Sequence, residues 1–207
     1  MTTVLYVNSS PRGDESAAAQ AAQQFLQALP EGVTVQELNL FDYGLPEYTH
    51  TLAAAKQKTM MGAELSAEEA SEWSGVTNLV DQFLAADHIL MTIPMWNFSI
   101  PYKFKHYIDL LTHPGVTFLM DKSGPRGVGS ASGTVIYSRG GDYSPKDGQP
   151  DPFDFQSPYI GAWAGLVGIS PLEEVLVQRT MGGPEAQAAA VNAAAKQLEE
   201  AATRLTD

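Results

Sequence analysis

The segment 89–101 constrains the fold more than any other part of the chain. It reads Ile-Leu-Met-Thr-Ile-Pro-Met-Trp-Asn-Phe-Ser-Ile-Pro, and its first half is apolar apart from Thr92. Such a run is typical of a strand that is buried on both faces of a parallel sheet. Because Pro94 has no N–H to donate to a neighbouring strand, the strand must end there. The sequence therefore predicts a central parallel strand followed directly by an apolar loop.

A helix is predicted after this loop. Apolar residues recur there at the spacing of one helix face, at Phe104, Tyr107, Ile108 and Leu111. We expect Ser99 to cap this helix and Pro101 to lie in its first turn. Strand, loop and helix in this order put the loop at the carboxyl end of a parallel strand, where open α/β sheets bind ligands.

The rest of the chain repeats this alternation. Further strands are predicted at 4–7, 33–39, 134–137 and 172–177, and helices at 17–29, 66–83, 101–112, 159–168 and 184–205. Ser66 and Glu69 have the spacing of a capping box. The pattern predicts an α/β fold, a three-layer sandwich around a parallel sheet with right-handed crossovers. We expect a single domain over 1–207 and the flavodoxin-like strand order 2-1-3-4-5, with strands 1 and 3 side by side.

Some segments depart from this alternation. Residues 51–63 fit neither a helix nor a strand pattern clearly. Residues 116–120 are predicted to be extended, as one arm of a hairpin, and the Gly- and Ser-rich residues 122–133 to form a flexible turn. The segment 142–157 is rich in Asp, Pro and Gly and is long for a connection in a compact domain, so we interpret it as a functional lid.

Composition excludes several classes of function. Asp and Glu number 24 against 12 Lys and Arg, and the net charge of -12 argues against a nucleic-acid or membrane partner. The chain has no cysteine, so any redox chemistry must come from a bound cofactor. Its histidines have no partner at metal-ligand spacing, so we expect no metal site. The first residues carry no basic segment and no run approaches the roughly 20 apolar residues of a membrane span, so a cytoplasmic protein is expected.

Polar and apolar groups follow three strands that we expect to be neighbours. Ser10 and Ser16 flank the start of the first helix, whose free amides suit a phosphate, although Ser16 as a simple cap is the plainer interpretation. The loop 95–98 offers an amide and apolar cover for a flat ring, and the glycines within 138–141 permit close approach. Ordinary core packing and an ordinary turn are the alternatives. Phosphate-binding motifs of the G-x-x-x-x-G-K-[ST] and G-x-G-x-x-G kinds are absent, which argues against a tightly held dinucleotide.

Together these stretches resemble the FMN-dependent NADH azoreductases, a family of quinone and azo-dye reductases with a flavodoxin-like fold. The similarity runs nearly end to end and includes Pro94-Met95-Trp96-Asn97-Phe98, Phe104-Lys105-x-Tyr107-Ile108-Asp109, Gly115-Val116-Thr117-Phe118 and Ser138-Arg139-Gly140-Gly141. The first and last of these elements together are specific, whereas either alone is weak.

The resemblance implies an FMN cofactor, reduced by NADH or NADPH, and a homodimer with two flavin sites at the subunit interface. The implied FMN contacts are Ser10, Ser16 and the amides of Ala17 and Ala18 for the phosphate, and Met95, Trp96, Asn97, Phe98, Ser138, Arg139, Gly140 and Gly141 for the ring. The flavin itself performs the chemistry, so no catalytic acid or base is expected, and Asn97 tunes the ring.

Quinones or aromatic azo compounds are the implied substrates, reduced by two electrons in a ping-pong exchange. On the substrate side of the ring we expect Phe118 and Trp163, with Met120 where an aromatic residue is usual. Tyr143, in the lid, is expected either to touch substrate or to cover the loop. Two other classes remain open: an FMN electron-transfer protein or FMN reductase, and a flavin-free interaction protein that keeps only the fold.

Overall fold

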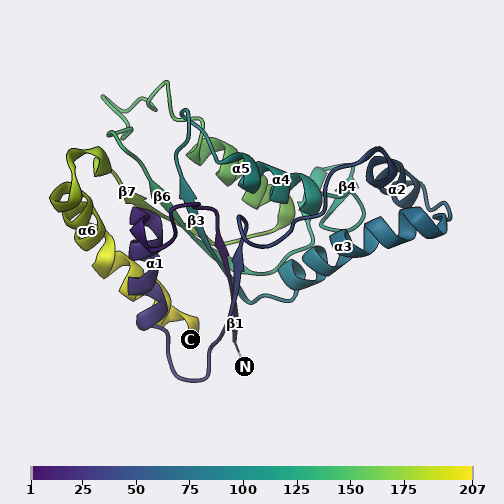
Figure 1. The fold of residues 1–207 in the computed structure, drawn as a ribbon, viewed down its shortest axis with the longest axis horizontal. Helices are drawn as coiled ribbons and strands as arrows, with labels where there is room; N and C mark the ends of the chain where they lie inside the picture. The colour runs from purple at the N-terminus through teal and green to yellow at the C-terminus, as the bar shows by residue number, and fades with distance from the viewer. Residues whose placement is uncertain (1, 207) are drawn as a thin grey trace.

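The computed structural model describes residues 2–206, which form a twisted parallel sheet with helices on both faces (Figure 1). The sheet has five strands in the order β2-β1-β3-β6-β7. Their bounds are β1 Thr3–Asn8, β2 Thr34–Asn39, β3 His88–Pro94, β6 Ser132–Ser138 and β7 Leu172–Val177. Every pairing between them is parallel, which confirms the predicted order 2-1-3-4-5.

Helices α1 and α6 cover one face of the sheet, and α3, α4 and α5 cover the other (Figure 1). The helices are α1 Ala17–Gln27, α2 His50–Met60, α3 Ala67–Leu84, α4 Tyr102–Leu111, α5 Ser157–Val167 and α6 Pro184–Thr203, with short 3-10 turns η1 Gly13–Glu15, η2 Thr180–Gly182 and η3 Arg204–Thr206. The predicted capping box is present at Ser66 and Glu69. Each layer of helices buries its own apolar cluster against the sheet, so the sandwich has two cores.

The position of a strand in the sheet decides how its apolar residues are used. In the central strand β3 every residue from His88 to Ile93 is buried, as the apolar run predicts. Strand β2 lies at the edge of the sheet, where it pairs only with β1. Of its residues only Leu38 is buried, and Val35 is exposed although it lies on the predicted apolar alternation. An edge strand can therefore show the apolar alternation of a strand although most of its side chains are not buried.

Two local predictions need correction, and the structure resolves one segment that the sequence left open. Ser99 does not cap α4: it forms a tight turn with Trp96, and α4 begins after Pro101, which occupies the N-cap position. The ambiguous segment after His50 is helix α2, whose N-cap Thr49 accepts a hydrogen bond from the Leu52 amide.

The predicted flexible turn at 122–133 contains a strand. Residues Gly124–Gly127 form β5, which pairs antiparallel with β4 Phe118–Asp121 in a hairpin. Gly127 lies so close to Gly168 that an added Cβ would be 2.2 Å from the Gly168 nitrogen. These glycines thus serve close packing of the hairpin on the end of α5, rather than flexibility.

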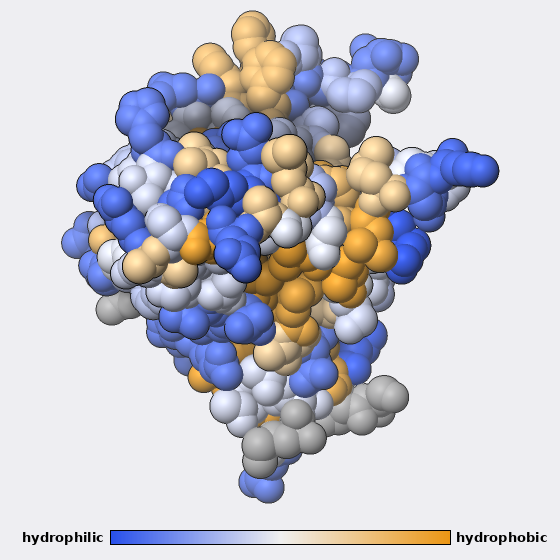
Figure 2. All heavy atoms as spheres, turned by 90° about the vertical axis from the view of Figure 1, so that its right-hand side faces the viewer, coloured by the Kyte–Doolittle hydropathy of each residue, from blue (hydrophilic) through white to orange (hydrophobic). Residues whose placement is uncertain are grey.

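The two chain termini and the loops after β1, β3 and β6 lie at opposite ends of the sheet (Figure 1). Strand β1 starts, and α6 ends, at the lower end, whereas the loops after β1, β3 and β6 lie at the opposite end. The side of the molecule that carries α2 and α3 in Figure 1 has an apolar area bordered by hydrophilic residues (Figure 2). Within residues 2–206, no helix has the length and hydropathy needed to cross a membrane.

Candidate functional site

The loops after β1, β3 and β6 leave the sheet side by side. Strand registers pair Asn8 with Thr92 and Pro94 with Ser138 at the carboxyl ends of the three strands. The Ser9 amide and hydroxyl both donate to the Thr92 carbonyl, at 3.2 and 2.6 Å. The Met95 amide donates to the Ser138 carbonyl at 2.8 Å. The three segments singled out in the sequence therefore meet at one edge of the sheet, and the space between their loops is called the crevice below.

The β1 loop leads into the amino end of α1. Ser16 occupies the N-cap position, but its hydroxyl makes no capping hydrogen bond to the described residues. The interpretation of Ser16 as a simple cap is therefore wrong for this structure. Ala17 and Ala18 are buried at the first turn, where helix geometry leaves amides unpaired and the helix dipole is positive. Uncommitted amides and a free hydroxyl are groups that fit a phosphate.

Backbone strain marks the β3 loop. Asn97 and Phe98 have φ of +47° and +70°, in the left-handed region that non-glycine residues rarely adopt. The turn is closed by two hydrogen bonds between the backbones of Trp96 and Ser99, at 2.9 and 3.0 Å. Trp96 and Phe98 are 36% and 44% exposed, which excludes the alternative that they pack in the core. Strain of this kind clusters at functional sites, and exposed rings in a crevice suit a flat ligand.

The β6 loop brings two glycines next to this turn. Carbonyls of Gly140 and Gly141 accept hydrogen bonds from the amides of Met181 and Arg179, and neither glycine N–H has an acceptor within residues 2–206. A Cβ added at Gly140 would lie 2.4 Å from the Met181 sulfur. A Cβ at Gly140 would meet only the flexible side chain of Met181, and one at Gly141 only the Tyr143 ring at 3.3 Å, so backbone packing requires neither glycine. Their two N–H groups are the uncommitted donors of this loop.

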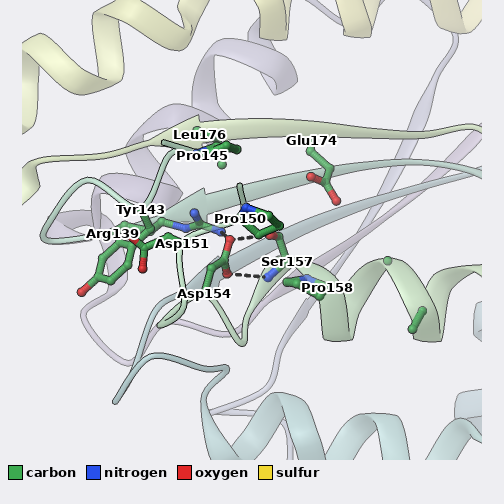
Figure 3. A pocket seen from close by; sticks show the side chains of 12 residues that line it. Arg139, Tyr143, Pro145, Pro150, Asp151, Asp154, Ser157, Pro158, Glu174 and Leu176 are labelled. Atoms are coloured by element: carbon green, nitrogen blue, oxygen red, sulfur yellow. Dashed lines mark hydrogen bonds and ion pairs between the residues drawn. The ribbon is translucent and has the colours of Figure 1, made fainter. Parts of the chain in front are cut away.

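The side chain of Arg139 is held by residues just before α5. Its side chain points toward α5, where its Nε donates to Gln156 at 2.9 Å and its Nη2 donates to Asp154 at 3.0 Å (Figure 3). Its amide donates to Val177 and its carbonyl accepts from Thr180. Its guanidinium forms an ion pair with Asp154 in which both side chains are nearly buried. The contact of Arg139 with a ligand stays a prediction.

Asp154 is stabilised as a carboxylate in this pair. Burial raises its pKa, but the hydroxyl and amide of Ser157, the charge of Arg139 and the Gln156 amide outweigh burial and hold the pKa below the usual value. Beside it lies a hollow of about 480 Å³ under the lid, walled by Tyr143, Pro150 and Leu176 (Figure 3). Glu174 faces this hollow, and burial raises the pKa of its carboxyl.

The residues expected on the substrate side are dispersed in one chain. Tyr143 packs against Phe98 with ring centroids 6.3 Å apart, so within the chain it covers the loop. Trp163 is 4% exposed and donates from Nε1 to the Thr112 hydroxyl at 3.1 Å. Phe118 and Met120 lie in the β4–β5 hairpin, which packs on the end of α5 and lies apart from the lid (Figure 1), and Met120 is 65% exposed.

Several polar residues that hold the strand-end loops or the lid in place were not anticipated from the sequence. Gln156 is fully buried and bonds to both Arg139 and Ile93, while Gln178 holds the start of the lid through Tyr143. Asn8 accepts from the Ser10 amide and the Thr92 hydroxyl at 3.1 and 3.0 Å. Strand alternation could have placed the Arg139 side chain on the same face as Tyr137, but no local pattern indicates the partners of a lone glutamine.

The comparisons with known proteins agree with this geometry. Residues 2–202 match a family model described as flavodoxin-like fold. An FMN-dependent NADH:quinone oxidoreductase from Pseudomonas fluorescens is 36% identical over 99% of this chain and 98% of its own length. One from Desulfotalea psychrophila is 36% identical over 87% of both chains.

Solved structures give the same result. An azoreductase from Bacillus anthracis has a TM-score of 0.86 and 27% identity, and covers 99% of this chain and 100% of its own. An FMN-dependent NADH-azoreductase from the same species, solved in complex with FMN, has a TM-score of 0.86 and 27% identity, with 100% of both chains covered. The chain therefore belongs to the flavodoxin-like fold family and, within it, to the FMN-dependent NADH:quinone oxidoreductases and azoreductases.

Proposed function

We propose that the chain is an FMN-dependent NADH:quinone oxidoreductase that also reduces the azo bond of aromatic azo compounds. The observation that carries this proposal is the meeting of three strand-end loops at one edge, each with uncommitted groups of the right kind. The relatives that match nearly the full length of the chain are named for this activity. When bound, FMN supplies the two-electron exchange between NADH or NADPH and the acceptor.

Each loop has a separate task in holding the cofactor. Ser10, Ser16 and the amides of Ala17 and Ala18 hold the phosphate at the positive end of α1. The loop 95–98 holds one side of the ring and orients it. The backbone of residues 138–141 completes the site, with Gly140 and Gly141 supplying amide donors.

The residues of the chain tune the ring by hydrogen bonding and by excluding water. Donors from the Gly140 and Gly141 amides, and from the Asn97 side chain, stabilise the negative charge that develops on reduction. Trp96 and Phe98 present exposed ring surface, which favours flat acceptors such as quinones because stacking and burial need few specific contacts. The mechanism requires no side-chain acid or base.

We also propose a homodimer of a single FMN-binding domain. The support is that Phe118 and Met120 are remote from the lid within one chain, so the substrate side is completed by the hairpin of a second copy. Leu119 and Met120 are exposed apolar side chains of the hairpin, which suits such a contact. The net charge of -12 disfavours nucleic acid and anionic lipid as partners. A cytoplasmic location stays a prediction.

Quinone-dependent oxidation of NADH by the purified yellow protein tests the function directly. An enzyme oxidises NADH continuously when a quinone is added, whereas an electron carrier binds FMN but turns over only with a protein partner. A Gly141→Pro variant, which removes one amide donor, should bind FMN and be reduced more slowly in stopped-flow spectra. A colourless protein that binds no added FMN would refute the proposal.

A further inference from the structure

Gln156 joins three parts of the molecule that are far apart in the sequence. It is fully buried just before α5, and its side-chain amide both donates and accepts a hydrogen bond. Its Nε2 donates to the Ile93 carbonyl at 2.9 Å, and its Oε1 accepts from Arg139 Nε at 2.9 Å. Ile93 precedes the β3 loop and Arg139 precedes the two glycines of the β6 loop. One amide therefore ties both loops to the start of α5.

The ion pair behind Gln156 holds it in place. Asp154 Oδ1 accepts from the Gln156 and Ser157 amides, both at 3.0 Å, and Oδ2 accepts from Arg139 (Figure 3). Arg139 is 2% exposed and stacks over the Tyr137 ring at 5.3 Å. Buried groups that are hydrogen-bonded in this way favour one arrangement, because losing a partner leaves a buried charge or amide unpaired.

A further hydrogen bond extends this network to the strained turn. The Phe155 amide donates to the Phe98 carbonyl at 3.1 Å, and Phe153 packs on the Phe98 ring with centroids 5.1 Å apart. The left-handed conformation of Phe98 must be held by its surroundings. The residues that hold it are thus sequence neighbours of Gln156.

We infer that Gln156 is a positioning residue, which sets the spacing between the β3 and β6 loops, and that Arg139 and Asp154 act with it. This inference rests on the proposed function, because these two loops are the walls proposed for the flavin ring. Gln156 is buried beneath the loops, so it acts through Ile93 and Arg139 rather than by touching the ring.

The first test needs neither flavin nor substitution. The Met95 amide donates to Ser138 at the end of β6, the Arg139 amide to Val177 at the end of β7, and the Gln156 amide to Asp154. In hydrogen exchange of the wild-type apoprotein in low denaturant, these three amides should become exposed in one common opening reaction. If the Gln156 amide exchanges through a separate opening of the lid, the inference is overturned.

The second test uses Gln156→Glu, Gln156→Met and a matched control. Gln156→Glu keeps the acceptor for Arg139 but loses the donor to Ile93, whereas Gln156→Met loses both. The control is Gln178→Met, because the Gln178 side chain also both donates and accepts: it makes three hydrogen bonds, with Asp142, Tyr143 and Ser144, all within the lid. In the apoprotein, the Gln156 variants should speed exchange in both 94–98 and 138–141, and the control only in 142–149.

Titration with FMN measures the effect of these variants on flavin affinity and on the flavin spectrum. Loss of at least one buried hydrogen bond should weaken FMN binding about tenfold in the Gln156 variants and shift the visible flavin band. Gln178→Met should keep the wild-type spectrum. Wild-type affinity and spectrum in a folded Gln156 variant, or an equal effect in the control, would overturn the inference. If instead the wild-type protein binds no FMN while the exchange pattern holds, the proposed function fails and the coupling of the loops stands.

Discussion

Acid should destabilise this protein through one buried histidine at the start of β3. His88 is 3% exposed, and its ring nitrogens lie 2.7 Å from the Ser132 hydroxyl and 3.1 Å from the Thr134 hydroxyl. Burial lowers its pKa from 6.5 to about 4. The unfolded chain therefore binds a proton near pH 6.5 that the folded chain does not accept until about pH 4.

The magnitude follows from this difference in pKa. Because the unfolded state binds more protons between these values, the free energy of unfolding is at its full value above pH 6.5 and falls as pH decreases toward 4. Each pKa unit corresponds to about 1.4 kcal/mol, so His88 accounts for a loss of about 3 kcal/mol. For a chain of this size, that is a large part of the usual net stability.

Urea unfolding at intervals between pH 7 and pH 4 measures this loss. The wild-type curve also contains His113, whose pKa is lowered to about 4 mainly by burial, so the variant His88→Gln is needed as a reference. A glutamine does not titrate, and the difference between the two curves isolates His88. Parallel curves for wild type and His88→Gln across this range would refute the reasoning.

Four further predictions concern the crevice and the β4–β5 hairpin. Ser16→Ala should change apoprotein stability in urea by less than about 0.5 kcal/mol, well below the usual loss of an N-cap, yet weaken FMN binding several-fold by titration. Asn97→Gly should stabilise the apoprotein by about 0.5–1 kcal/mol through relief of the positive φ, while steady-state assays show slower quinone reduction. Gly127→Ala should cost about 3 kcal/mol or more in denaturant unfolding, because the added Cβ meets backbone of Gly168. Gly140→Ala should be nearly neutral in the same measurement, because its Cβ meets only the exposed side chain of Met181.

The sheet could be predicted because its strands carry strong local patterns. The β3 run is apolar at almost every position, and parallel topology then places the three loops together without knowledge of any contact. Strand β5 escaped prediction because its sequence, Gly-Pro-Arg-Gly, contains the residues least favoured in strands. Pairing with β4 and packing on Gly168 supply what local preference does not.

The crevice could be predicted as a set of segments but not as a set of side-chain contacts. The sequence places Arg139 next to Gly140, yet only the face of β6 decides that its guanidinium meets Asp154. Gln156 lies 63 residues from its partner Ile93, so nothing local indicates their hydrogen bond. The strain at Asn97 is likewise invisible, because asparagine tolerates many conformations besides the left-handed one.

The separation of the two ends of the sheet has a practical consequence for handling the protein. Strand β1 starts and α6 ends at the end remote from the three loops (Figure 1). A reporter, an affinity handle or a surface anchor joined to either terminus would thus extend away from the crevice. Immobilised on an electrode through its carboxyl end, the protein would present the crevice to the surrounding solution, so dyes and quinones would reach it freely.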